Sequence, residues 1–285
     1  MKPAPFVHHV PKTLDDALKT LAEVASKDGR VLAGGQSLVP IMAFRLAKPA
    51  HLVDINGVAG LGKLASDGKT LSIGACVRHA AFHKVVIVNP LGQLLTVVAR
   101  HIAHYPIRTR GTFCGSLAHA DPSSEWCLVA ATLDATLVAR SVCGARTIAA
   151  SDFFAGIMST TLADDELLAE ARLPLLSDDT RFGFNEFSRR AGDFAMAASL
   201  ATYRVQDGKI RDARIGVGGA ESFPRRIPEA EAALNGNGTT DAAFRTAANA
   251  AAKAIDPLED HQTNADYRRD LVRAVVRRAL EQSVS

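Results

Sequence analysis

Two glycine-containing segments, far apart in the chain, have the residue types that bind the phosphates of a nucleotide. Residues 33–40 read AGGQSLVP, and residues 112–122 read TFCGSLAHADP. Glycine has no Cβ, so it can adopt a positive φ and let an anion approach backbone N–H groups closely. An ordinary left-handed turn is the alternative for a lone Gly-Gly pair, and the second segment weakens that alternative. Together the segments predict two backbone cradles for one nucleotide cofactor.

The elements beside these segments would position them. The first segment follows an apolar run, residues 31–33, that predicts a buried strand, and it leads into a predicted helix over residues 38–46. The second leads into a predicted helix over residues 122–133, with Asp121 as N-cap and Pro122 at the first helical position. Helix N-termini favour anions. Glu125, in the first turn, would either complement the helix dipole or accept hydrogen bonds from sugar hydroxyls, and the sequence leaves both open.

The remaining pattern is a mixture of helices and strands. Thr13 and Asp16 form a capping-box pattern that opens a predicted helix over residues 15–26. Further helices are predicted over residues 90–99 and in the last third of the chain, where the final one covers 265–282. Strands are predicted over residues 51–55, 71–75, 135–140, 167–173, 182–188, 197–205 and 214–217. The turn-rich stretch 174–180 predicts a domain boundary.

Composition excludes several classes of protein. The chain has 285 residues, 47% of them hydrophobic, and its net charge of +3 is not gathered into a basic stripe, so nucleic acid is not an expected partner. No apolar run is long enough to predict a transmembrane helix, and the start of the sequence lacks a signal-peptide pattern, so we expect a cytoplasmic protein. The four cysteines have neither redox-pair nor ferredoxin spacing. We therefore expect no iron–sulfur cluster in this chain.

Other possible motifs are weaker. Residues 216–219, GVGG, lack the G-x-G-x-x-G spacing of a dinucleotide fold, and the nine histidines show no zinc-ligand pattern. We accordingly predict neither a metal site nor a catalytic acid, base or nucleophile. The arginines of the last helix predict either a solvated face or a docking surface for a partner subunit.

The two segments, in this order and at this separation, resemble the FAD-binding medium subunit of the molybdenum hydroxylases, which include xanthine dehydrogenase and aerobic carbon monoxide dehydrogenase. The resemblance extends over residues 2–6, 33–38, 52–55, 112–125, 166–168, 190–195 and 267–280. It implies an α+β fold with a two-lobed FAD-binding domain of the PCMH (vanillyl-alcohol-oxidase-like) type, residues 1–56 and 57–176. A C-terminal α+β domain with a small antiparallel sheet and helices would follow over residues 177–285.

The resemblance also implies which residues bind FAD. They are Leu32, Ala33, Gly34, Gly35, Gln36, Ser37 and Leu38 around the pyrophosphate; Thr112, Phe113, Cys114, Gly115, Ser116 and Glu125 on the adenine and ribityl side; Ile102 and Leu168 packed on the flavin; and Arg190 and Asp193 near the isoalloxazine edge. For Arg190 and Asp193 a surface ion pair is the alternative. Family members often have glycine at position 114 and asparagine at position 116, so we expect Gly115 to approach the cofactor most closely and Cys114 to be a small packing residue.

The function implied by the resemblance is electron transfer. Electrons would arrive from [2Fe-2S] clusters in a small partner subunit and leave through FAD to an external acceptor, while a large partner subunit with the molybdenum cofactor oxidises a small N-heterocycle or carbon monoxide. A free-standing FAD-dependent oxidase and a nucleotide-binding scaffold without a redox role are the alternatives. The sequence contains no nicotinamide motif and leaves the acceptor open.

Overall fold

The N-terminal part of the molecule is a small parallel sheet with one helix against it. The structure is a computed structural model that describes residues 2–261 and 263–284. The sheet has the order β1-β3-β2 and is accompanied by two α-helices and a 3-10 turn: β1 (Val7–His9), α1 (Leu14–Val24), η1 (Ala25–Lys27), β2 (Gly29–Leu32), α2 (Leu38–Ala43) and β3 (His51–Asp54). The Thr13 hydroxyl accepts the Asp16 N–H at 3.1 Å, which confirms Thr13 as the N-cap of this helix, although α1 itself ends at Val24.

A five-stranded sheet in the order β4-β5-β10-β6-β7 forms the middle of the molecule. Its strands are β4 (Leu64–Ser66), β5 (Thr70–Gly74), β6 (Thr136–Ser141), β7 (Gly144–Ala149) and β10 (Leu167–Pro174). Around it lie η2 (His79–His83), α3 (Pro90–Ala99), α4 (Tyr105–Arg108), α5 (Phe113–His119), α6 (Glu125–Thr132), α7 (Ala150–Phe153) and the hairpin β8 (Phe154–Gly156) and β9 (Ser159–Thr160). All neighbouring strands of the sheet are antiparallel.

The C-terminal part is an antiparallel sheet covered by helices, as the sequence predicts. The sheet has the order β11-β12-β13-β14, and its elements are β11 (Arg181–Phe187), β12 (Ala197–Gln206), β13 (Lys209–Gly218), β14 (Arg225–Arg226), α8 (Pro228–Leu234), α9 (Asp241–Ala254) and α10 (Ala265–Gln282). Helix α10 packs on β11 and β12 as well as on α9. Among the described residues, no helix is both long enough and apolar enough to cross a membrane.

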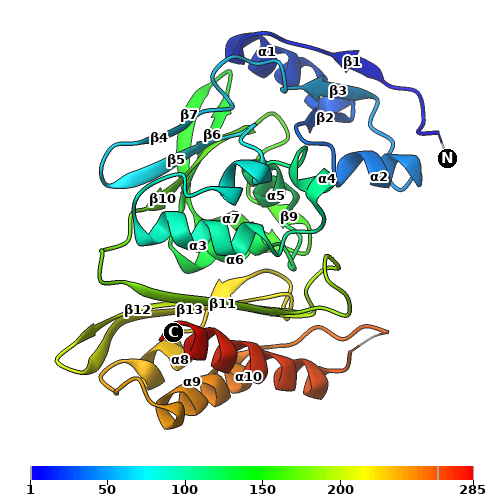
Figure 1. The fold of residues 1–285 in the computed structure, drawn as a ribbon. Helices are drawn as coiled ribbons and strands as arrows, with labels where there is room; N and C mark the ends of the chain where they lie inside the picture. Colours follow the sequence, from blue (N-terminus) through cyan, green and yellow to red (C-terminus); the bar gives the residue numbers. More distant parts are fainter. Residues whose placement is uncertain (1, 262, 285) are drawn as a thin grey trace.

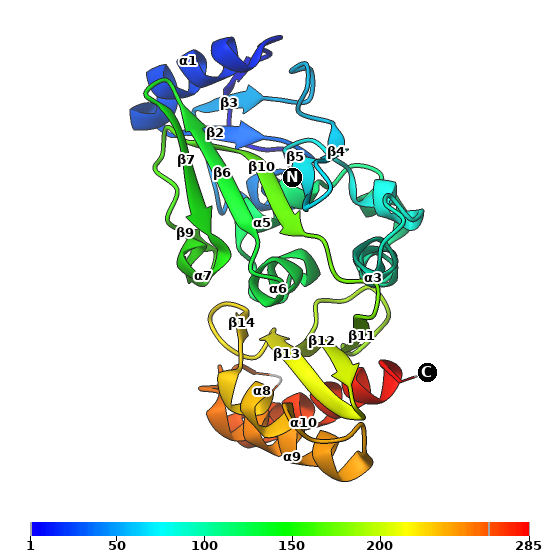
Figure 2. The same cartoon turned by 90° about the vertical axis from the view of Figure 1, so that its left-hand side faces the viewer.

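Helices α3 and α6 lie between the two larger sheets. Figure 1 shows them below the middle sheet and directly above β11, β12 and β13, and the turned view in Figure 2 shows the same layering. Helix α6 contacts β12 and β13, and α3 contacts β11. Phe184 and Leu200 of the C-terminal sheet belong to the same apolar cluster as Trp126 of α6. The sheets therefore share one layer of helices, and the division of the chain at residues 56 and 176 stays a prediction.

The predicted helix over residues 122–133 begins too early. Helix α6 starts at Glu125, with Ser124 rather than Asp121 as N-cap. The Asp121 carboxylate accepts the Ser123 N–H at 2.9 Å, while the Pro122 carbonyl accepts the Gly219 N–H and the Ser123 hydroxyl donates to the Ala195 carbonyl, both at 2.8 Å. Tertiary hydrogen bonds to the C-terminal part thus replace the first helical turn.

Replacing Gly216 with alanine is expected to lower the free energy of unfolding by about 1 to 3 kcal/mol. Gly216 lies on β13 under α6, where a Cβ would press on the Thr132 hydroxyl and lie 2.9 Å from Leu128 Cδ1. The helix would have to move away from the sheet. Urea unfolding followed by circular dichroism measures the change. An unchanged midpoint would mean that α6 can shift without a loss of stability. This packing also explains why the glycine-rich stretch 216–219 is not a nucleotide motif.

Candidate cofactor-binding site

The first glycine segment leaves the C-terminal end of β2 and turns into α2. Gly35 has a φ of +72°, as a left-handed turn requires, whereas Gly34 does not have a positive φ. Gly34 is needed for a close approach instead, because a Cβ there would press on the Arg110 carbonyl oxygen and lie 2.6 Å from Gly111 Cα. The two chain segments therefore touch at Gly34, next to the second glycine segment.

Free amides line the turn that follows. Within residues 2–261 and 263–284, the backbone N–H groups of residues 35–38 donate to no acceptor. The Gln36 side chain donates to the Gly34 carbonyl at 3.1 Å, which holds the turn in shape. A run of free N–H groups at the start of a helix is an anion-binding arrangement.

The second segment is the start of helix α5, which the sequence analysis did not predict. Thr112 is its N-cap, and its hydroxyl accepts the Gly115 N–H at 3.0 Å. A Cβ on Gly115 would lie 2.5 Å from that hydroxyl and 4.0 Å from the Ala33 Cβ. Gly115 thus faces the first segment, and its closer approach to the cofactor, compared with Cys114, stays a prediction.

A cavity of about 270 Å³ separates the two segments. Its lining residues are Arg30, Val31, Leu32, Ala33, Gly34, Gly35, Gln36, Ser37, Leu38, His79, Gly111, Thr112, Gly115, Ser116, Ala118 and His119. The lining contains the guanidinium of Arg30 and no carboxylate, so it suits an anion. Three features of the cavity fit the diphosphate of FAD. They are the free amides, the close backbone contacts that leave no room for a Cβ, and the positive charge of the lining.

Several lining residues were not predicted from the sequence. Gly111 directly precedes Thr112, so its position next to the second glycine segment could have identified it as a site residue. His79 has no such signal, because its ring is positioned by Trp126, whose indole N–H donates to His79 Nδ1 at 2.9 Å. Burial, together with the positive charges of Arg78 and Arg108, lowers the pKa of His79 to about 3, so the imidazole is neutral.

Arg78 bridges the two segments from behind the cavity. Its guanidinium donates to the Arg110 carbonyl and, at 2.5 Å, to Asn56 Oδ1. Asn56 in turn donates to the Ala33 carbonyl at 2.7 Å. The bridge fixes the separation of the two segments, and its side chains, Arg78 and Asn56, do not line the cavity.

Replacing Arg78 with methionine is expected to weaken FAD binding about tenfold, because both hydrogen bonds that join the segments disappear. Flavin fluorescence during titration of the apoprotein measures the dissociation constant. The matched control is Arg269→Met, on the exposed face of α10, which should bind FAD as the unaltered protein does. Equal affinities for both variants would contradict a bridging role.

Four of the predicted site residues have side chains in the apolar core rather than on the cavity. Phe113 and Cys114 are 0% and 2% exposed, and burial raises the pKa of the Cys114 thiol, so Cys114 is a packing residue as predicted. Ile102 and Leu168 are also buried in this core. The structure therefore does not bring these side chains to the cavity.

Glu125, also predicted as a site residue, is the first residue of α6 and does not line the cavity. Burial, together with the nearby Glu186 carboxylate, raises the pKa of its carboxyl to about 8. At neutral pH the carboxyl group is therefore mostly protonated. It then carries little negative charge, which argues against the interpretation that Glu125 interacts favourably with the helix dipole.

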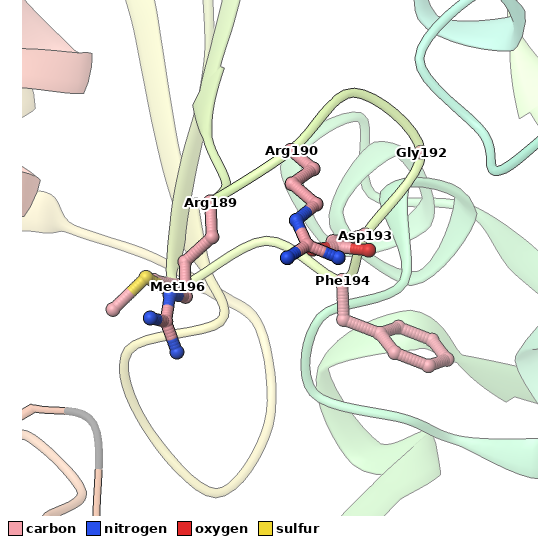
Figure 3. Close-up of a pocket in the computed structure, with 6 residues that line it drawn as sticks. All are labelled: Arg189, Arg190, Gly192, Asp193, Phe194 and Met196. Carbon is pink, nitrogen blue, oxygen red and sulfur yellow. The ribbon is translucent and has the colours of Figure 1, made fainter.

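Arg190 and Asp193 lie on a different cavity, of about 650 Å³, formed by the loop between β11 and β12. Figure 3 shows Arg189 and Met196 on one side of this loop and the ring of Phe194 on the other. The Asp193 N–H donates to the Arg190 carbonyl at 3.0 Å. No lining residue is shared between this cavity and the one at the glycine segments.

The loop nevertheless rests on the FAD-binding part of the chain. Gly192 has a φ of +89°, and a Cβ there would press on the imidazole of His104, the N-cap of α4. Helix α4 leads directly to Gly111 and the second glycine segment. The C-terminal loop and the cavity are thus joined through one short helix.

Comparisons with known proteins agree with this geometry. Residues 4–176 match the model of the FAD binding domain in molybdopterin dehydrogenase, and residues 182–283 match the model of the CO dehydrogenase flavoprotein C-terminal domain. The chain is 38% identical to the nicotine 6-hydroxylase medium subunit of Paenarthrobacter nicotinovorans, over 95% of this chain and 94% of the relative. It is 32% identical to the carbon monoxide dehydrogenase medium chain of Hydrogenophaga pseudoflava, over 98% of this chain and 97% of that relative.

A solved structure has the same fold. Quinoline 2-oxidoreductase from Pseudomonas putida 86 superposes with a TM-score of 0.94 at 34% identity, covering 99% of this chain and 98% of that one. Both domains of the chain are matched, and both glycine segments fall within the matched FAD-binding domain. The chain therefore belongs to the FAD-binding medium subunits of the molybdenum hydroxylases, and it is an oxidoreductase subunit.

Proposed function

We propose that this chain is the electron-transfer subunit of a heterotrimeric molybdenum hydroxylase. The observation that carries the proposal is the cavity between the two glycine segments, whose free amides and close backbone contacts suit FAD. When bound, FAD supplies two-electron redox chemistry, and the protein contributes binding, orientation and nearby charge. The residues of both segments would hold the cofactor, and no side chain is assigned as an acid or a base.

The electron donor is proposed to be a small partner subunit with [2Fe-2S] clusters, and a large partner subunit would hold the molybdenum cofactor. The chain's own cysteines support this division. The four cysteines have neither redox-pair nor ferredoxin spacing, whereas an iron–sulfur cluster requires several thiolates that converge on one site. Electrons would therefore reach this chain from outside it.

The proposed substrate of the complex is a small N-heterocycle. The chain is 38% identical to a nicotine 6-hydroxylase subunit, against 32% for a carbon monoxide dehydrogenase subunit. This order of similarity favours the heterocycle over carbon monoxide.

Three further features are proposed with this function. They are a cytoplasmic location, a division into residues 1–56, 57–176 and 177–285, and contact of Arg190 and Asp193 with the isoalloxazine edge. The last point is supported by the close approach of Gly192 to His104, because the helix that begins after His104 leads to the second glycine segment. A cation at Arg190 would then favour reduced, anionic flavin.

The test is anaerobic addition of N-heterocycles to the purified complex and to the isolated chain loaded with FAD. Loss of visible flavin absorbance in the complex alone would support electron transfer from the partners. Loss in the isolated chain would instead favour a free-standing oxidase. Failure to retain flavin after gel filtration, even with partners present, would favour a scaffold without redox function.

A further inference from the structure

His79 lies directly beneath the second glycine segment. Residues 77–79 run antiparallel to residues 111–113: the His79 N–H donates to the Gly111 carbonyl, and the Phe113 N–H donates to the Val77 carbonyl, both at 3.0 Å. A Cβ on Gly111 would press on the His79 ring, with Cδ2 at 2.7 Å. The ring is 4% exposed and lines the cavity between the segments.

The hydrogen bond from Trp126 decides which ring nitrogen carries the proton. An indole N–H can only donate, so His79 Nδ1, 2.9 Å away, must accept and is unprotonated. Trp126 cannot turn away, because it is fully buried with ring centroids 5.1 Å from Phe82 and 4.9 Å from Phe113. The neutral ring therefore carries its proton on Nε2.

The Nε2–H group has no acceptor within the chain. Among residues 2–261 and 263–284 it makes no hydrogen bond, and it is not one of the fully buried side-chain atoms that lack a partner. It therefore keeps access to the cavity that the ring lines. Because Nε2–H opens onto the cavity and has no partner among the described residues, an acceptor bound there can form a hydrogen bond with it.

We propose that His79 Nε2–H donates a hydrogen bond to an oxygen of the FAD diphosphate, and that Trp126 is a positioning residue that keeps the imidazole in the donating tautomer. This inference rests on the proposed location of FAD between the glycine segments. The donor is uncharged, so it contributes affinity without a requirement for protonation. Arg78 and Arg108 are the charged groups that face the ring and oppose its protonation.

The experiment compares FAD affinities of full-length apoprotein variants by fluorescence titration. His79→Phe removes the donor, and we expect affinity to fall about tenfold. His79→Gln places an amide N–H near the position of Nε2, and its affinity should stay within about threefold of the unaltered protein. Equal affinities for all three proteins would overturn the proposal.

A second readout isolates the role of Trp126. In ¹⁵N spectra of the apoprotein, the histidine signals that disappear in His79→Gln should show the Nε2–H tautomer, and Trp126→Phe should convert part of this population to the Nδ1–H tautomer. Affinity for FAD should fall with that population. A Nδ1–H tautomer in the unaltered protein would overturn the proposal.

The pH dependence separates a neutral donor from a cationic one. The ratio of affinities of the unaltered protein and His79→Gln should stay constant between about pH 5.5 and 8.5, because the ring is neutral throughout this range. A fall in the ratio through pH 6 to 7 would identify an imidazolium instead. The Gly34→Ala variant distinguishes the two proposals. If this variant also binds FAD normally, the proposed location of FAD between the glycine segments is wrong, and not only the proposed role of His79.

Discussion

Replacing Gly34 with alanine is expected to weaken FAD binding by at least about 100-fold while the chain stays folded. The added Cβ would press on the Arg110 carbonyl oxygen and lie 2.6 Å from Gly111 Cα, and neither backbone atom can rotate away as a side chain can. The segments would have to separate, which displaces the free amides of residues 35–38 from the facing helix α5. Retention of flavin through gel filtration and fluorescence titration measure the loss.

The matched control is Gly62→Ala. Gly62 does not have a positive φ, and a Cβ there would meet nothing within 4 Å, so the same substitution leaves the cavity intact. Both variants should give the far-ultraviolet circular dichroism spectrum of the unaltered protein. Normal FAD affinity in the folded Gly34→Ala variant would mean that the cofactor does not lie between the two segments.

Replacing Glu125 with glutamine is expected to stabilise the apoprotein increasingly as pH rises. Burial, with help from Glu186, raises the pKa of this carboxyl from 4.5 to about 8, so the folded state keeps a proton that the unfolded chain releases in this interval. The contribution of Glu125 to stability is therefore fully present below pH 4.5 and lost as pH rises through 8. The advantage of the glutamine variant should approach about 5 kcal/mol above pH 8.

Urea unfolding at pH 5, 7 and 9 provides the measurement, and Glu166→Gln is the matched control. The Arg146 guanidinium holds the pKa of the Glu166 carboxyl below its usual range, so its stabilisation is already complete at pH 5 and the control should show the same loss at all three values. If the difference in unfolding free energy between Glu125→Gln and the unaltered protein does not grow with pH, Glu125 is already ionised in the folded protein. The carboxylate could then accept hydrogen bonds from sugar hydroxyls.

Elements with strong local signals were predictable from the sequence. Helix α3 covers residues 90–99 as predicted, because Asn89 caps it and Pro90 fits its first position. Helix α10 likewise starts after the Asn264 cap and ends at Gln282 as predicted. By contrast, α5 was missed, since a glycine within a seven-residue helix looks like a loop and its end at Ala120 has a left-handed φ of +51° without glycine.

The site was predictable only where its residues are close in sequence. Both glycine segments can be recognised from the local sequence, because small residues follow or precede apolar runs. The hydrogen bond of His79 joins residues 47 positions apart, and the bridge of Arg78 needs Asn56 and Arg110 together, so no local pattern reveals either. The core positions of Phe113, Ile102 and Leu168 also depend on packing that a motif does not encode.

The shared layer of helices has a consequence during synthesis on the ribosome. Residues 126–132 of α6 are all buried, with β12 and β13 among the neighbours of this helix, yet these strands are made about 70 to 90 residues later. In a nascent chain that ends near residue 180, the faces of α3 and α6 that pack on the C-terminal sheet would be exposed apolar surface. Folding of the flavin-binding part is therefore completed from the C-terminal side, and a chaperone that shields this surface until then would raise the yield of native protein.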